Sequence, residues 1–146
     1  MINDYFQYLD LPNIPNELIE LDLKQLETRD NIFIEPNYPF YKQYLVDDKL
    51  SEYLKSIIVD PFFASYQVIR HGISVHKDFN RTECFNYILD TGGDDSRLSM
   101  YDDDTTTVLY SGHVEPLKWH RINVSKFHGV SGLTRPRISI SVTTKK

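Results

Sequence analysis

The stretch FHGVSGLTRPRISISVT, residues 127–143, holds the clearest secondary-structure signal of the chain. In its second half apolar and hydroxyl-bearing side chains alternate strictly, in the order Ile138, Ser139, Ile140, Ser141, Val142 and Thr143. Successive strand residues point to opposite faces, so this pattern predicts a β-strand with one apolar and one polar face. The polar face, which continues from Arg137, could meet either water at a sheet edge or a polar pocket, and the alternation does not decide between them.

Further short runs rich in aromatic and β-branched residues precede this stretch. They span residues 62–70, 73–77, 84–89, 98–101, 108–110 and 119–124, and turn-forming residues such as Gly92-Gly93 and Gly132 separate several of them. About eight short strands at this spacing predict a mainly β fold with a double-stranded β-helix core, a jelly roll of the cupin-like kind. We expect this core to occupy residues 61–143.

The region before residue 60 has helical periodicity. Behind Asp47 and Asp48, which suit the positive end of a helix, apolar residues follow one helical face at Leu50, Tyr53, Leu54, Ile57 and Ile58. A weaker helix is predicted after Pro15, with Asn16 as its cap. We therefore expect residues 1–60 to form a helical support region whose helices cover the outer face of one sheet. We expect residues 1–146 to form a single domain.

Composition narrows the class of protein. The chain has 146 residues, of which 40% are hydrophobic and 25% charged, as is typical of globular domains, and its net charge of -5 argues against a general nucleic-acid-binding surface. A local basic groove stays possible, although solvated strand ends are the simpler interpretation of its candidates, which are Lys118, Arg121, Lys126 and Arg135. No apolar run approaches the roughly 20 residues that a bilayer span needs, so no membrane association is expected.

One cysteine and five histidines bear on location and chemistry. Cys84 excludes an intrachain disulfide and is expected to be a small core residue; with no secretory signal pattern, a cytoplasmic protein is expected. His71, His113 and His120 lack any spacing typical of metal ligands and are expected in loops or on the surface. Residues 102–104, three aspartates, are expected to form a solvated hairpin turn rather than a calcium loop.

The other two histidines belong to an ordered motif. If residues 76–78 are extended, His76 and Asp78 point to the same face, and His128 from a distant strand would complete a 2-His-1-carboxylate triad with open metal positions. A histidine-aspartate pair alone is common by chance. The motif gains its weight from Arg137, nine residues after His128, and Ser139, eleven residues after it.

These segments together resemble the Fe(II)- and 2-oxoglutarate-dependent dioxygenases, and within them the compact prolyl-4-hydroxylase-like branch, which has phage-encoded members. The resemblance covers about residues 60–143 and rests on the segments VHKD (75–78), FHGV (127–130) and RIS (137–139). It implies that His76, Asp78 and His128 bind Fe(II). It further implies that Arg137 pairs with the distal carboxylate of 2-oxoglutarate and that Ser139 adds a hydrogen bond.

Softer matches extend this resemblance. Tyr66 and Asn86 occupy places where family members contact the cosubstrate 2-oxoglutarate, Ile88 stands where some relatives have a tyrosine, and Arg81 is a tentative substrate-binding residue. The implied reaction uses O2 and couples oxidative decarboxylation of 2-oxoglutarate to hydroxylation of a substrate. A protein or peptide side chain such as proline is favoured as the substrate, in the host cytoplasm if the chain is phage-encoded.

Two interpretations from other classes stay open. The chain could be a non-catalytic jelly-roll module that binds a metal or a dicarboxylate, or a structural viral β-sandwich in which the motif is coincidental. The identity of the metal is open as well, because two imidazoles and one carboxylate also bind Mn, Co, Ni or Zn.

Overall fold

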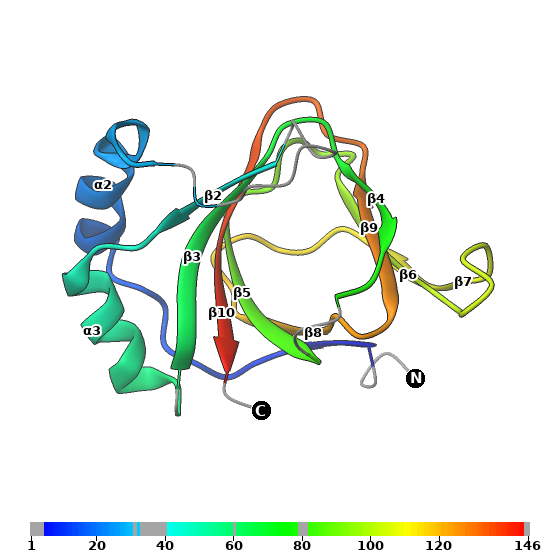
Figure 1. Cartoon of the computed structure of the whole chain (residues 1–146), viewed down its shortest axis with the longest axis horizontal. Coiled ribbons are helices and arrows are strands. Elements are labelled where there is room, and N and C mark those ends of the chain that lie inside the picture. Colours follow the sequence, from blue (N-terminus) through cyan, green and yellow to red (C-terminus); the bar gives the residue numbers. More distant parts are fainter. Residues whose placement is uncertain (1–4, 31, 33–40, 60, 79–81, 145–146) are drawn as a thin grey trace.

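The computed structural model describes residues 5–30, 32, 41–59, 61–78 and 82–144, and in these ranges the chain forms two antiparallel β-sheets and short helices (Figure 1). The six-stranded sheet has the order β1 (Phe6–Tyr8), β8 (His120–Asn123), β5 (Glu83–Asp90), β10 (Arg137–Thr144), β3 (Pro61–Ile69) and β2 (Tyr41–Leu45). The four-stranded sheet has the order β4 (Ile73–His76), β9 (Phe127–Ser131), β6 (Arg97–Tyr101) and β7 (Val108–Gly112). The predicted mainly β jelly-roll architecture is confirmed.

Two features of this strand inventory differ from expectation. β1 and β2 lie before residue 60, so that region adds strands as well as helices to the fold. His128 was expected on a strand, but the bounds of β9 were not among the predicted runs, because a glycine in the middle of a strand weakens the strand signal. The structure explains that glycine: a Cβ on Gly129 would lie 2.9 Å from the carbonyl oxygen of Ile73 on the neighbouring strand.

The two α-helices of the described chain differ in how they begin. α3 (Asp48–Ile57) has the expected cap, since the Asp47 carboxylate accepts a hydrogen bond of 2.8 Å from the backbone N–H of Leu50. α2 (Asn16–Lys24) is capped by Pro15 without a side-chain hydrogen bond, so the expectation that Asn16 caps it is wrong. In the described part of the chain, no helix has the length and apolar character to cross a membrane.

Two apolar cores lie on opposite faces of the six-stranded sheet. The outer core fills the space between that sheet and the helices, which flank β3 and β2 in Figure 1; it includes Leu50, Leu54, Tyr66, Tyr87, Trp119, Ile140 and Val142. The inner core includes Phe6, Cys84, Ile88, Leu98, Met100 and Ile122, which come from both sheets. Burying each large apolar side chain contributes about 1.5–3 kcal/mol, so both cores stabilise the fold.

Successive side chains of β10 point alternately to the outer core and to the interior between the sheets. Its isoleucines and valine enter the outer core, whereas Arg137, Ser139 and Ser141 point to the inner side and are almost fully buried, at 5%, 4% and 2% exposure. The polar face of this strand therefore lies in the interior between the sheets. Of the two possibilities that the alternation leaves open, the solvent-facing edge is excluded.

Candidate functional site

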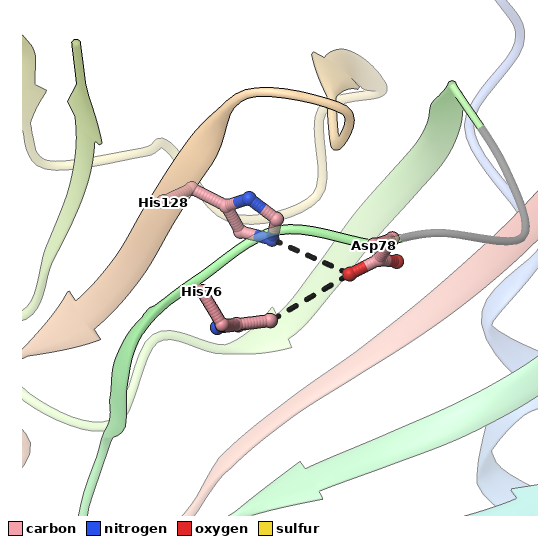
Figure 2. Close-up of side chains that lie close together, drawn as sticks. All are labelled: His76, Asp78 and His128. Carbon is pink, nitrogen blue, oxygen red and sulfur yellow. Dashed lines mark ion pairs between the residues drawn. The ribbon is translucent and has the colours of Figure 1, made fainter. Parts of the chain in front are cut away.

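Three predicted metal ligands meet between β4 and β9 (Figure 2). His76, the last residue of β4, lies directly opposite His128 of β9 in the antiparallel register. β4 ends at His76, one residue earlier than predicted, so Asp78 lies beyond the strand. The backbone N–H of Asp78 donates a 2.8 Å hydrogen bond to the carbonyl of Val124. Sheet register thus positions the two imidazoles, and a loop hydrogen bond positions the carboxylate.

The donor atoms of this triad face one another. Candidate ligand atoms of His76, Asp78 and His128 all lie within 4.8 Å of one another. The Nε2 atoms of His76 and His128 lie 3.6 and 3.9 Å from Oδ1 of Asp78 (Figure 2). His128 is buried and the other two residues are half-buried, so the cluster is reachable from one side.

Backbone carbonyls fix the imidazole rings for metal binding. Nδ1 of His76 lies 2.8 Å from the carbonyl oxygen of Ser74, and Nδ1 of His128 lies 2.7 Å from that of Lys126. A carbonyl oxygen only accepts, so in the neutral form of each ring Nδ1 carries the proton and Nε2 has the lone pair. Lone pairs on two nitrogens and an adjacent carboxylate form a donor set that suits a divalent transition metal.

A second polar group lies on the inner face of the six-stranded sheet; we call it the inner polar cluster and define it as Arg137, Ser139, Ser141, Asn86 and His120. Ser141, Asn86 and His120 form a row across three neighbouring strands, because Ser141 pairs with Asn86 and Asn86 pairs with His120. His128 faces the same interior, since its register partner is the inner-core residue Met100. The candidate metal ligands and the inner polar cluster therefore share one interior.

Loop geometry holds Arg137 at the start of β10. Gly92 has a φ of +86°, and its carbonyl accepts hydrogen bonds of 2.8 and 3.1 Å from the N–H groups of Thr134 and Arg135. A Cβ at Gly92 would lie 3.1 Å from the Cβ of Arg137. Glycine is therefore required here both for the positive φ and for the close approach of this loop to Arg137.

Three buried atoms of the inner polar cluster lack a hydrogen-bond partner among the described residues: Nε of Arg137, Nε2 of His120 and Oγ of Ser141. Burial lowers the pKa of the Arg137 guanidinium to about 10, which is still high enough to keep it charged at neutral pH. An unsatisfied buried polar group costs about 1–3 kcal/mol, and a charged one more. A carboxylate, which a guanidinium binds through two parallel hydrogen bonds, would satisfy it, so the cluster fits a small carboxylate ligand.

Two softer predictions have different outcomes. Asn86, 7% exposed, lies in the inner polar cluster, and Ile88 lies on the same inner face opposite Ser139. The contact of Asn86 with the cosubstrate stays a prediction. Tyr66 does not lie in the inner polar cluster. It pairs with Ile140, which places its side chain on the outer face, and its hydroxyl donates a 2.8 Å hydrogen bond to Asp22. The prediction that Tyr66 contacts the cosubstrate is corrected, because the register of β3 turns its side chain toward the helices. Arg81 lies outside the described residues.

His120 is the residue of this interior that the sequence analysis missed. His71 and His113 are exposed, as predicted, but His120 is fully buried in β8. Burial first, and then the positive charge of Arg137, lower the pKa of His120 to about 3. A signal for this position existed: His120 shares strand parity with Ile122 and Val124, and a histidine on an apolar strand face is an interior residue.

Three of the four basic candidates are paired with carboxylates. Arg121 lies 3.4 Å from Glu83, Lys118 lies 3.3 Å from Glu115, and Nε of Arg135 lies 3.0 Å from Asp90. The Lys118 and Arg135 pairs fit the interpretation as solvated strand ends, since exposed ion pairs are common surface features, whereas Arg121 is half-buried.

No protein-family model and no curated protein matches the chain. Solved structures of oxalate decarboxylase do match: one from work on the Mn(II) centres of the Bacillus subtilis enzyme has a TM-score of 0.53, and one from work on a structural element that modulates proton-coupled electron transfer has a TM-score of 0.52. Both are 12% identical, and the matches cover 82% and 83% of this chain but 29% of each neighbour.

The chain spans less than a third of the length of these neighbours. At 12% identity the likeness shows the fold alone. The chain therefore has a cupin-like jelly-roll core, and its interior brings together a possible His-Asp-His metal site.

Proposed function

We propose that this protein is an Fe(II)- and 2-oxoglutarate-dependent dioxygenase that hydroxylates a substrate. One observation carries the proposal: a single jelly-roll interior holds both a converging His76, Asp78 and His128 cluster and the buried cation Arg137, whose Nε has no partner among the described residues. A divalent metal fits the first feature and a carboxylate fits the second. 2-Oxoglutarate is a ligand that can engage both.

Each group of side chains has a distinct task in this proposal. His76, Asp78 and His128 would hold Fe(II) through Nε2, a carboxylate oxygen and Nε2, leaving other metal positions open. Arg137 would bind the distal carboxylate of 2-oxoglutarate, with Ser139 on the same strand face as a further donor. The inner-core side chains of Ile88, Leu98 and Met100 would exclude water from the bound ligands.

The bound groups supply the oxidising chemistry: 2-oxoglutarate and O2 are converted to succinate and CO2, while one oxygen atom enters a C–H bond of the substrate. The chain orients the participants and limits side reactions. We extend the proposal to a protein or peptide substrate, such as a prolyl side chain, on the strength of the prolyl-hydroxylase-like motifs alone.

The test is an anaerobic titration of Fe(II) and 2-oxoglutarate, followed by the weak visible metal-to-ligand charge-transfer band. We expect the band in the parent protein, its loss in His128→Ala and its weakening in Arg137→Ala. His113→Ala is the matched control, because His113 is exposed in a loop and lies outside the triad. Succinate formation after O2 is admitted then reports turnover.

Other outcomes separate the alternative functions. A band or a tightly held metal without any succinate formation would identify a non-catalytic binding module. If a folded parent protein shows neither the band nor an Fe(II)-dependent rise in melting temperature, a structural jelly roll is favoured. Binding of Mn(II) in place of Fe(II), with equal stabilisation, would reopen the metal assignment.

A further inference from the structure

His120 is buried on the inner face of the six-stranded sheet, the face that also holds Arg137, whose positive charge acts on the ring. It is not one of the three candidate metal ligands. Its ring packs against two aromatic rings of β1, with its centroid 5.3 Å from that of Phe6 and 6.5 Å from that of Tyr8. Nδ1 lies 3.5 Å from the carbonyl oxygen of Lys118, and Nε2 has no partner among the described residues. A buried ring held on one side and unpaired on the other points to a ligand contact.

The partner of Nδ1 determines what Nε2 can do. The Lys118 carbonyl only accepts, so Nδ1 carries a proton and Nε2 of the neutral ring is an acceptor. Only the imidazolium form donates from both nitrogens. Nε2 can therefore donate to a carboxylate without loss of the Lys118 contact only if the ring takes up a second proton.

The surroundings hold the ring neutral before a ligand arrives. Around His120, the described elements carry the titratable side chains of Tyr8 in β1, Cys84 in β5 and Arg137 in β10; its direct strand partner Asn86 is uncharged. Two further groups lie one ring away: the Lys118 ammonium, 4.3 Å from the Tyr8 ring centroid, and Tyr110, which stacks on Phe6. Among described groups, no carboxylate acts on the ring, and the positive charge of Arg137 opposes its protonation. A carboxylate bound by Arg137 would bring the first negative charge into this environment and remove the opposition.

We propose that His120 is a further binding residue for the carboxylate at Arg137, and that ligand binding is coupled to uptake of a proton from solvent by the His120 ring. Ring protonation converts Nε2 from an acceptor into a donor toward the ligand, while Nδ1 keeps its bond to Lys118. Ser141, whose buried Oγ is also unpartnered in the described chain, would complete the contact. The inference rests on the proposed function for the identity of the ligand, a dicarboxylate.

The experiment is calorimetric titration of succinate, and separately of 2-oxoglutarate with Fe(II) under anaerobic conditions. Each titration is run in two buffers of different ionisation enthalpy, which gives the number of protons exchanged. Succinate lacks the keto acid that chelates a metal, so it tests the carboxylate contacts alone. We expect uptake of up to one proton, and an affinity that rises as pH falls from about 8 to about 6.5, because the bound state then holds more protons than the free state.

Substitutions assign the proton. His120→Gln keeps a donor but cannot titrate, so we expect proton uptake to disappear, the pH dependence to flatten, and the affinity to fall about tenfold with loss of a charge-assisted hydrogen bond. His113→Gln, at an exposed loop histidine, should leave all three quantities unchanged. If His120→Gln does not fold, 15N spectra of the parent imidazoles decide: Nε2 of His120 should gain a proton when succinate binds.

The inference is overturned if succinate binds without proton uptake, if Nε2 keeps its free-state signal, or if His120→Gln binds equally well. Failure of the proposed function gives a different pattern. Proton-coupled succinate binding without an Fe(II) band would retain His120 as a carboxylate ligand and remove the oxygenase assignment. An Fe(II) band without proton uptake would retain the oxygenase assignment and remove the proposed role of His120. If neither succinate nor 2-oxoglutarate binds, both proposals are overturned.

Discussion

On the outer face of the six-stranded sheet the buried Asp22 carboxylate is surrounded by donors from its own chain, whereas on the inner face the buried Arg137 guanidinium forms no ion pair within the described residues. Asp22 pairs with Arg29 and accepts hydrogen bonds from the Tyr66 hydroxyl at 2.8 Å and from the backbone N–H of Asp47 at 3.1 Å. Both residues are almost fully buried.

The difference indicates what each polar group is for. A buried charge that the fold itself satisfies links elements together, and Asp22 connects α2, β3 and the start of α3 in this way. A buried charge that the fold leaves unsatisfied lowers stability unless a ligand compensates it. Stability should therefore depend on the outer group, and ligand binding on the inner one.

The largest effect is expected from Asp22→Ala. It removes the acceptor shared by Arg29, Tyr66 and Asp47, and breaking a buried charge network by removing one partner costs about 3 kcal/mol or more. Urea unfolding followed by circular dichroism measures the change. Glu20→Ala is the control, since Glu20 is exposed on the same helix. Equal, small losses in both variants would mean that the outer network contributes little.

A smaller effect on the same network is expected from Tyr66→Phe. Burial and then the hydrogen bond to Asp22 raise the pKa of Tyr66 above its ordinary value, so its hydroxyl stays protonated as a donor. Loss of that donor should lower the free energy of unfolding by about 1 kcal/mol and leave 2-oxoglutarate affinity unchanged. Tyr53→Phe, which removes an exposed hydrogen bond to Asn13, is the comparison. Weakened 2-oxoglutarate binding in Tyr66→Phe would reinstate Tyr66 as a cosubstrate contact.

Tyr66 also shows where prediction from sequence reached its limit. Aromatic and β-branched residues predicted β3, and period-two alternation predicted β10, but which face of β3 turns inward depends on how the two strands pair. The pairing of Tyr66 with Ile140, rather than with Ser139, decides the question. That register is a property of two segments far apart in the chain, so no local pattern contains it.

The candidate metal ligands were easier to predict than the bounds of the strand that carries one of them. His76, Asp78 and His128 were identified from order and spacing, and the structure brings them within 4.8 Å of one another. The strand expected to carry His128 had no predicted bounds, because Gly129 weakens the strand pattern and is explained only by the close approach of Ile73. His120 was missed for the opposite reason: its strand was predicted, but its parity with Ile122 was not used.

The smallest change in stability is expected from Arg137→Met, although the substituted residue is as buried as Asp22. Methionine retains much of the side-chain volume and removes a charge that the described chain does not compensate, so the free energy of unfolding without ligand should change by less than about 1 kcal/mol or rise. In the same variant the rise in melting temperature on adding 2-oxoglutarate and Fe(II) should largely disappear. Arg135→Met, at an exposed arginine two residues earlier, should retain that rise. A loss above about 2 kcal/mol in Arg137→Met alone would show that the guanidinium stabilises the fold itself, and the contrast between the two faces would then no longer distinguish structural from ligand-binding charges.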